Sequence, residues 1–187
     1  VKGIKKKYND KIFYTGNPIR SEISKYKKDY KTHHQDGFLN LLIFGGSQGA
    51  SFFSDIIPDS INKLDNKKKS LLRVFHQVRN NEFERVKKCY HSMNVESEVK
   101  TFFYNLPELL NNSHLLISRS GASTVAEVAA TKTPAIFIPF HHSIDDDQRL
   151  NTIELEKIGQ VIVKNEKKLD SNQLYKVIDE LIEKPEI

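Results

Sequence analysis

The stretch LNLLIFGGSQGA, residues 39–50, decides the fold that the sequence predicts. Its first half is a nearly continuous apolar run, which is typical of a strand buried on both faces of a sheet. The glycine-rich turn that follows contains Ser47, Gln48 and Gly49, and a helix is expected from about Ala50. A strand, a glycine-rich turn and a helix in this order are typical of one unit of a parallel α/β sheet.

The rest of the chain repeats this alternation. Apolar runs predict further strands at residues 71–78, within 95–103, and at 115–118, 135–139 and 160–163. Helical spacing predicts helices from about 50, interrupted near Pro58, and then at residues 81–93, 106–112, 123–131, 147–158 and around 174–182. About six alternations predict an α/β domain with a Rossmann-like, doubly wound parallel sheet and helices on both faces.

The composition excludes several classes of protein. The chain has 187 residues, of which 38% are hydrophobic and 28% are charged, as in an ordinary globular domain. No apolar run approaches the roughly 20 residues that a membrane-spanning helix needs. The single cysteine, Cys89, excludes an intrachain disulfide and a multi-cysteine metal site. One domain is therefore expected, at residues 38–187.

The net charge of +5 is concentrated at the amino-terminal end. Residues 1–31 hold ten basic and three acidic side chains, whereas the remainder is slightly acidic. We interpret residues 1–37 as a basic leader or interdomain linker that includes the turn GNPIR. An anionic membrane surface is a partner that this charge allows. No nucleic-acid partner is expected, because no recognised nucleic-acid motif or aromatic ladder accompanies the charge.

Ligands of doubly wound sheets bind beyond the carboxyl ends of the strands, so the loops there are the candidates for a site. Residues 45–50 match neither the P-loop nor the dinucleotide fingerprint, but glycines and a helix start favour a phosphate, to which Ser47 can donate. Residues 118–127 (SRSGASTVAE) form a second strand–glycine–helix junction. Two such junctions can hold two parts of one ligand, phosphate at one and sugar at the other.

Glu127 has two interpretations. Its carboxylate can accept hydrogen bonds from the vicinal hydroxyls of a ribose. Thr124 and Glu127 also have the spacing of a capping box, in which the glutamate would only cap its own helix. The spacing leaves both interpretations open.

Two other segments have weaker signals. Residues 139–148 contain two histidines and three aspartates, which indicate either a divalent metal site or the acidic start of a helix; we favour the helix. Arg20 follows the turn at residues 16–19 and suits bidentate contact with a phosphate. On its own, Arg20 is best interpreted as an ordinary surface arginine.

Together these segments resemble one family. GNPIR at residues 16–20, GGSQGA at 45–50, SRSGASTVAE at 118–127 and the segment 146–151 have the order and spacing found in the MurG family. These are bacterial N-acetylglucosaminyltransferases that convert lipid I to lipid II in peptidoglycan synthesis. The resemblance is to the carboxyl-terminal, donor-binding half of a two-domain GT-B glycosyltransferase. It implies that the amino-terminal half carries the lipid I site and the catalytic base, so that this chain alone is expected to be inactive.

The resemblance implies that this half binds UDP-N-acetylglucosamine, without a cofactor or a metal. Its implied contacts are the diphosphate at Arg20 and Ser47, the uracil at the backbone of Phe103, the ribose at Glu127, and the N-acetylglucosamine at Gln148 with Asn151 nearby. The whole expected donor site is Arg20, Ser47, Gln48, Gly49, Phe103, Ala122, Ser123, Thr124, Val125, Ala126, Glu127, Gln148 and Asn151. The family is expected in the cytoplasm, peripheral on the inner face of the cell membrane.

Two positions depart from the family pattern. Asp147 stands where the family usually has His or Gln, and Phe103 stands where a smaller aliphatic residue is common; a backbone contact at residue 103 would survive that change. A degraded domain that folds and binds nothing is one alternative, against which the intact Ser47, Glu127 and Gln148 argue. Two functional alternatives also stay open. One is an enzyme like the UDP-N-acetylglucosamine 2-epimerases. The other is a non-catalytic subunit that binds the nucleotide sugar and docks to a separate acceptor-binding half.

Overall fold

The structure is a computed structural model that describes residues 13, 16–26, 37–46, 51–140 and 146–183. In this part of the chain, parallel strands form a six-stranded sheet in the order β3-β2-β1-β4-β5-β6. Their bounds are β1 (Leu39–Phe44), β2 (Leu72–Gln77), β3 (Glu96–Lys100), β4 (Leu115–Ser118), β5 (Ala135–Phe137) and β6 (Val161–Val163). The strand order reverses between β1 and β4, which is the switch point at which doubly wound sheets bind ligands. The predicted fold class is confirmed.

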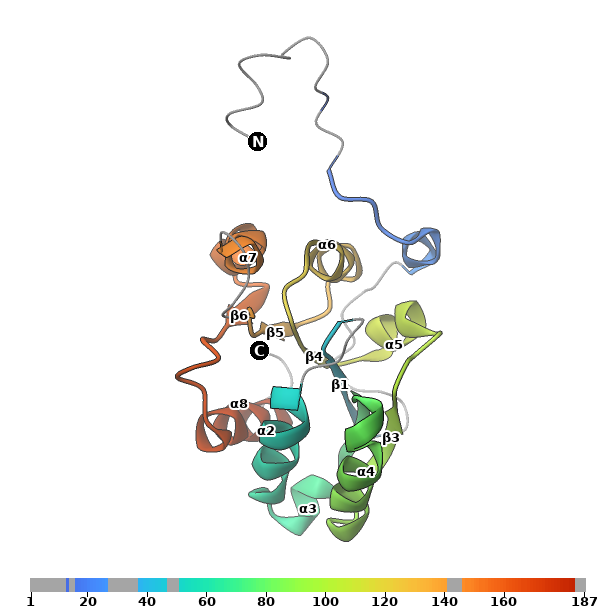
Figure 1. The fold of residues 1–187 in the computed structure, drawn as a ribbon, viewed down its shortest axis with the longest axis vertical. Coiled ribbons are helices and arrows are strands. Elements are labelled where there is room, and N and C mark those ends of the chain that lie inside the picture. The colour runs from blue at the N-terminus through green and yellow to red at the C-terminus, as the bar shows by residue number, and fades with distance from the viewer. Residues whose placement is uncertain (1–12, 14–15, 27–36, 47–50, 141–145, 184–187) are drawn as a thin grey trace.

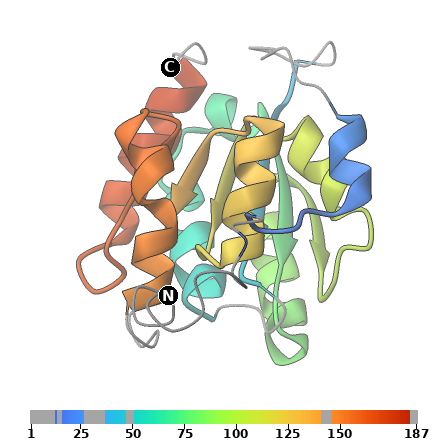
Figure 2. The ribbon, with the colours of Figure 1, turned by 90° about the horizontal axis from the view of Figure 1, so that it is seen from above.

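Helices cover both faces of the sheet, as Figure 1 shows. One face carries α2 (Ser51–Asn62), α4 (Phe83–Ser92) and α8 (Ser171–Glu183). The short α3 (Asn66–Lys69) precedes β2, and η3 (Asn80–Glu82) leads into α4. The other face carries η2 (Ser21–Lys25), α5 (Leu106–Asn112), α6 (Ala122–Thr131) and α7 (Asp147–Lys157). From above, η2, α6 and α7 lie in a row across this second face (Figure 2).

The side chains of β1 alternate between two apolar cores. Leu41 and Ile43 enter the core beneath α2, α4 and α8, whereas Leu42 enters the core beneath α5 and α6. All three are fully buried. A strand that is buried on both faces has no polar side to display, so it reads as a continuous apolar run. This is why the apolar run at residues 39–44 predicted the central strand correctly.

The prediction that Pro58 interrupts the first helix is wrong. α2 runs through Pro58, whose side chain is buried. Proline cannot donate to the carbonyl four residues earlier and crowds it, so the carbonyl of Ser54 loses its helical partner. Arg85 Nη1 donates to that carbonyl oxygen at 3.4 Å. The helix continues because a side chain on α4 supplies the hydrogen bond that the proline cannot.

One segment of the expected linker, η2, packs on the domain. Ile23 in η2 is 1% exposed and belongs to the core beneath α5 and α6. This anchor places Arg20, which precedes η2, against α6. The domain boundary at residue 38 stays a prediction. Every helix among the described residues is too short or too polar to span a membrane.

Candidate functional site

The first loop at the carboxyl edge of the sheet begins after Phe44 and includes Gly46. Its φ of +85° is in the left-handed region, where a side chain would strain the backbone. Gln77 at the end of β2 donates from Nε2 to the carbonyl oxygens of Gly46 (3.3 Å) and Thr101 (3.2 Å), so it ties three neighbouring segments together. The predicted ligand residues Ser47, Gln48 and Gly49 lie outside the described residues.

The second loop leads into α6, whose first turn is open to a ligand. Gly121 is the N-cap residue and makes no side-chain capping hydrogen bond. Ala122 and Ser123 are exposed, and the first helical hydrogen bond runs from the N–H of Val125 to Gly121. Free N–H groups and the positive end of the helix dipole favour an anion here. Thr124 lies inside the helix, which excludes the capping-box interpretation of Glu127.

Glu127 lies one turn further along α6 and forms an ion pair with Arg20. Its Oε1 is 3.3 Å from Arg20 Nε, and the two side chains are 4% and 48% exposed. Burial raises the pKa of Glu127, and the Arg20 guanidinium opposes that rise. Arg20 is therefore not an isolated surface arginine: the fold holds it beside a buried carboxylate.

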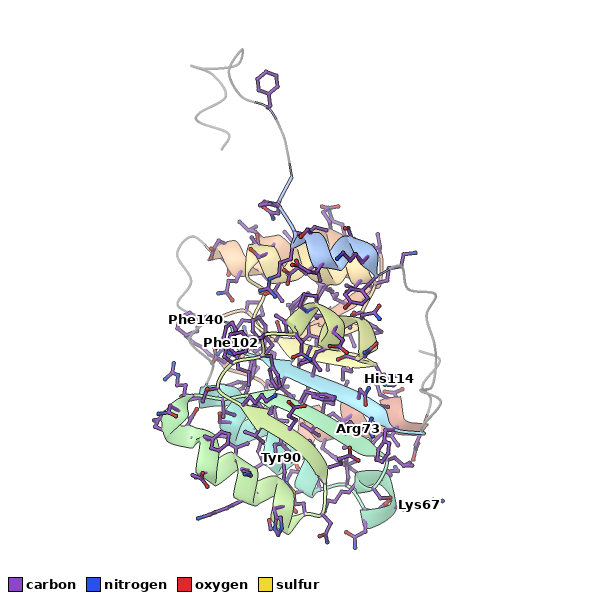
Figure 3. All side chains as sticks on the ribbon, turned by 90° about the vertical axis from the view of Figure 1, so that its right-hand side faces the viewer. Lys67, Arg73, Tyr90, Phe102, His114 and Phe140 are labelled. Atoms are coloured by element: carbon purple, nitrogen blue, oxygen red, sulfur yellow. The ribbon has the colours of Figure 1, made fainter. Side chains whose placement is uncertain are left out.

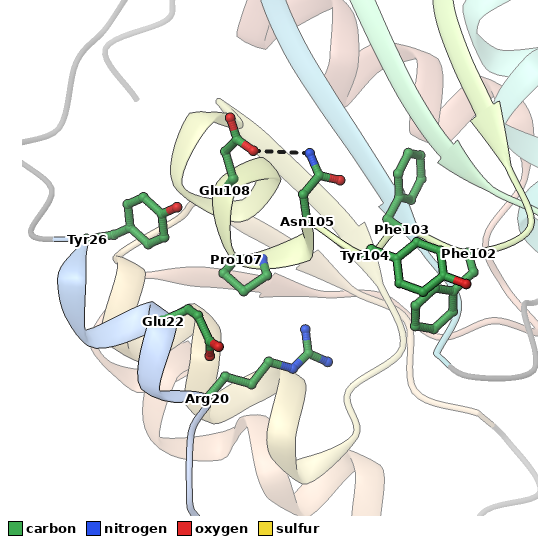
Figure 4. A pocket seen from close by; sticks show the side chains of 9 residues that line it. All are labelled: Arg20, Glu22, Tyr26, Phe102, Phe103, Tyr104, Asn105, Pro107 and Glu108. Carbon is green, nitrogen blue, oxygen red and sulfur yellow. Dashed lines mark hydrogen bonds between the residues drawn. The ribbon is translucent and has the colours of Figure 1, made fainter.

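A pocket of about 470 Å³ opens beside Arg20, between η2 and the start of α5 (Figure 4). The rings of Phe102 and Tyr104 meet edge to face, with centroids 4.9 Å apart, and form one of its walls. Phe103 also lines the pocket, but its side chain is 4% exposed and packs in the core with Leu42. Phe103 thus occupies the core, and a ligand at this position would meet mainly its backbone. The lining residues are Arg20, Glu22, Tyr26, Phe102, Phe103, Tyr104, Asn105, Pro107 and Glu108.

The predicted sugar-binding residues on α7 hold neighbouring backbone. Gln148 Oε1 accepts a hydrogen bond from the N–H of Phe140 at 2.9 Å. Asn151 Nδ2 donates to the carbonyl oxygen of Ser120 at 3.0 Å. α7 therefore fixes both the loop that follows β5 and the loop that follows β4.

Asp147 is an acidic residue in the first turn of α7, and its Oδ1 accepts from the N–H of Gln148 at 2.8 Å. This is the helix-start role that the sequence favoured for the aspartates. Among the residues that the structure describes, no three His, Cys, Asp or Glu side chains converge as metal ligands would. Residues 141–145 lie outside that part, so the metal interpretation of the two histidines is not tested.

Sequence reasoning missed Arg119. Its side chain is 11% exposed; Nη1 donates to the carbonyl oxygen of Ile138 at 3.0 Å, and Nη2 lies 2.7 Å from Glu166 Oε1. The available signal was a charged residue directly after β4, a strand whose residues are all buried. Such a residue has to find partners inside the protein.

The comparisons with known proteins agree with this geometry. Residues 40–187 match the family model described as the glycosyltransferase family 28 C-terminal domain. The chain is 36% identical over 182 residues to the UDP-N-acetylglucosamine–N-acetylmuramyl-(pentapeptide) pyrophosphoryl-undecaprenol N-acetylglucosamine transferase of Rhizobium etli, covering 96% of this chain and 48% of that relative. The protein of the same name from Bartonella quintana is 38% identical over 169 residues, covering 90% and 44%.

Solved structures give the same result. The crystal structure of MurG from Acinetobacter baumannii superposes with a TM-score of 0.68 at 27% identity, over 86% of this chain and 50% of that one. The glycosyltransferase of kitacinnamycin, at 15% identity and a TM-score of 0.59 over 91% and 40% of the two chains, shares the fold. The chain thus spans about half the length of the curated relatives that it matches. A match over most of its length nevertheless shows that the chain belongs to glycosyltransferase family 28, as a C-terminal domain of that family.

Proposed function

We propose that this domain binds UDP-N-acetylglucosamine and is the donor half of an enzyme that transfers N-acetylglucosamine to lipid I, which gives lipid II. The observation that carries the proposal is the contact between Arg20 and Glu127 of α6. These residues come from distant parts of the chain, and they are the two that the family resemblance assigns to the diphosphate and the ribose. The names of the relatives from Rhizobium and Bartonella supply the reaction.

The order of the structural elements supports this orientation of the donor. η2 with α5, then α6, then α7 follow one another across one face (Figure 2). The pocket lies beside η2 and α5, Glu127, the partner of Arg20, lies on α6, and Gln148 lies on α7. Uracil, ribose with diphosphate, and N-acetylglucosamine follow one another in the donor. We therefore assign the uracil to the pocket and the backbone of Phe103, and the sugar to the α7 side of the site.

The proposed site residues on α6 are Ala122, Ser123, Thr124, Val125, Ala126 and Glu127. The open first turn of this helix would receive a phosphate together with Arg20, and the glycine-rich turn with Ser47, Gln48 and Gly49 would complete the diphosphate site. Gln148 would hold the N-acetylglucosamine, with Asn151 nearby. Binding would require Arg20 to exchange part of its contact with Glu127 for the diphosphate.

The proposed reaction inverts the anomeric carbon. The 4-hydroxyl oxygen of the muramoyl sugar attacks that carbon, the bond to the diphosphate oxygen breaks, and its electron pair leaves with UDP. The hydroxyl proton passes to a base that the resemblance places in the amino-terminal half. Arg20 and the start of α6 would stabilise the charge that grows on the diphosphate. Because the acceptor site belongs to the other half, this chain alone is expected to form no lipid II.

The proposed site of action is the cytoplasmic face of the cell membrane, because the acceptor in the relatives' names is linked to undecaprenol. The basic residues 1–37 would contribute attraction to anionic lipid. Cosedimentation with vesicles is expected to require anionic lipid and to be lost on adding salt. Equal binding to neutral vesicles would contradict this part of the proposal.

The test of donor binding is calorimetric titration of the chain with UDP-N-acetylglucosamine, with UDP-glucose and ADP-glucose as comparators. We expect the strongest binding for UDP-N-acetylglucosamine. Glu127→Ala should weaken it about 10- to 100-fold, because hydrogen bonds to a charged group contribute about 1.5–3 kcal/mol. The matched control is Glu154→Ala, which removes an exposed carboxylate paired with Lys157 and should leave the affinity unchanged.

Two outcomes would count against the proposal. Equal affinity for all three nucleotides would remove the specificity for the donor. Unchanged affinity in Glu127→Ala, with the folded state verified by circular dichroism, would remove Glu127 from the site. The epimerase alternative differs in its reaction: it predicts inversion at C2 of the donor's N-acetylhexosamine rather than transfer to a lipid, and the relatives' names favour transfer.

A further inference from the structure

Arg119 and Glu166 form a buried ion pair at the carboxyl edge of the sheet. Nη2 of Arg119 is 2.7 Å from Oε1 of Glu166, and each side chain is only 11% exposed. Nη1 of the same guanidinium donates to the carbonyl oxygens of Ile138 (3.0 Å) and Pro139 (3.4 Å). One side chain on the loop after β4 therefore holds the segment that follows β5 and the segment that follows β6.

Aromatic rings enclose the same guanidinium. Its central carbon lies 5.1–5.7 Å from the ring centroids of Phe52, Phe53 and Phe140. Phe52 and Phe53 belong to the first turn of α2, directly after the glycine-rich turn of β1. The contacts of Arg119 thus reach the segments after β1, β5 and β6. A guanidinium has the planar face and the several N–H groups needed for all of them at once, whereas an ammonium does not.

We propose that Arg119, held by Glu166, is a positioning residue for the sugar end of the donor site, an inference that rests on the proposed function. Arg119 fixes Ile138, Pro139 and the ring of Phe140. The N–H of Phe140 in turn binds Oε1 of Gln148, the residue assigned to N-acetylglucosamine. Arg119 acts through this chain of contacts and does not itself touch the donor.

A second arginine provides a matched control at the opposite end of the sheet. Arg73 Nε lies 2.6 Å from Glu96 Oε1, and its guanidinium stacks 4.2 Å from the centroid of Phe38. Figure 3 shows Arg73 at one end of the strands, and Phe102 and Phe140 at the other. Arg73→Lys therefore makes the same chemical change in a pair with the same kind of contacts, but away from the candidate site.

The first measurement needs no ligand. Amide hydrogen exchange followed by NMR is expected to be about tenfold faster at Phe140 in Arg119→Lys than in the unchanged chain, while Ile43 in the central strand keeps its rate. Glu166→Gln, which leaves an acceptor oxygen for Arg119, should give a smaller increase at Phe140. Arg73→Lys should leave Phe140 unchanged. Equal rates at Phe140 in all variants would overturn the inference, because Arg119 would then not fix the loop.

The second measurement compares UDP with UDP-N-acetylglucosamine in calorimetric titrations. Arg119→Lys is expected to keep the affinity for UDP within about twofold and to reduce the advantage of UDP-N-acetylglucosamine over UDP at least fivefold. Glu166→Gln should retain most of that advantage. A uniform loss of affinity for both ligands would show a merely structural role and overturn the inference.

The two proposals fail in different ways. If the unchanged chain binds UDP-N-acetylglucosamine selectively and Arg119→Lys keeps the full selectivity, the positioning role is wrong and the proposed function stands. If the unchanged chain binds neither ligand, the proposed function is wrong and the sugar-positioning role falls with it. The exchange rate of Phe140 then still decides whether Arg119 fixes the loop.

Discussion

The two halves of the sheet differ in how they pair their charged side chains. In the half that contains β2 and β3, Arg73 pairs with Glu96, its direct partner in the strand register, and the side chains are 25% and 51% exposed. In the half that contains β4 to β6, Arg119 pairs with Glu166 between loops, and both side chains are 11% exposed. The first pair follows from strand pairing alone. The second exists only because the fold gathers several loops at the edge where the candidate site lies.

The largest expected effect is the loss of stability when the arginine of either ion pair is removed, and it tests the difference between the two pairs directly. Arg119→Ala should lower the free energy of unfolding by about 3–5 kcal/mol, because it removes the positive charge from an ion pair in which both side chains are largely buried. Arg73→Ala should lower it by about 1 kcal/mol or less, because exposed ion pairs contribute little. Urea denaturation of both variants at one pH measures the difference. Equal losses would mean that burial does not distinguish the two pairs.

The next prediction concerns His76, a fully buried polar group of β2. Its Nδ1 is 2.9 Å from the hydroxyl oxygen of Tyr90, and burial lowers the pKa of His76 to about 3. The imidazole is therefore protonated near pH 6.5 in the unfolded chain but stays neutral in the folded chain. Above that pH the free energy of unfolding does not depend on this group. Below it, the free energy of unfolding falls by about 1.4 kcal/mol per pH unit until the pH approaches 3.

Lowering the pH from 7 to 5 should thus reduce the free energy of unfolding by about 2 kcal/mol. His76→Asn, which does not titrate and whose amide stands near the place of Nδ1, should flatten this dependence. His91→Asn on the exposed side of α4 is the matched control and should keep it. Urea denaturation at a series of pH values measures the slope, and an unchanged slope in His76→Asn would assign the acid sensitivity to other groups.

The smallest expected effect concerns Glu127, where one substitution should increase the stability of the fold but weaken ligand binding. Burial raises the pKa of this carboxyl, so the folded chain holds the proton more tightly than the unfolded chain does. Stability is then lost as the pH rises from 4.5, the ordinary value, through the raised pKa, and the ionised carboxylate destabilises the fold at pH 7. Glu127→Gln should raise the thermal midpoint at pH 7, by at most about 4 °C.

The same substitution should give no gain at pH 4, where the glutamate is already protonated, and it should still weaken donor binding. Glu96→Gln in the exposed pair of the other half serves as the control and should leave the midpoint unchanged at both pH values. A lower midpoint for Glu127→Gln at pH 7 would mean that the Arg20 contact outweighs the desolvation of the carboxylate. The charge at residue 127 would then stabilise the folded chain, rather than destabilise it while providing a contact for the ligand.

Local patterns in the sequence carried much of this structure. The apolar runs predicted the central strands β1, β4 and β5 because these are buried on both faces, and the glycines at residues 45–49 and 121 marked the loops that follow β1 and β4. Pro58 shows where a local rule fails. Its effect on α2 depends on Arg85, a residue of another helix that supplies the lost hydrogen bond. The helix propensities of the residues in α2 cannot predict this hydrogen bond, because its donor lies on another helix.

Within the candidate site, too, some features could be predicted from the sequence and others depended on the fold. Spacing indicated Glu127 but left a capping role open, and the position of Thr124 inside α6 removed it. Arg20 had no partner that the sequence could identify, since the contact with Glu127 depends on how Ile23 anchors η2 on the domain. Arg119 lay within a quoted motif without a role, because its partners come from loops after other strands.

The sequence by itself determined the alternation of strands and helices, the parallel sheet and the family, because each depends on the spacing of residues along the chain. Only the tertiary structure decided which charges meet. Ion pairs such as Arg20–Glu127 and Arg119–Glu166 join segments that are distant in sequence, and short-range periodicity carries no information about them. They form where the reversal of strand order brings the loops together, which is also where an α/β sheet of this kind binds its ligand.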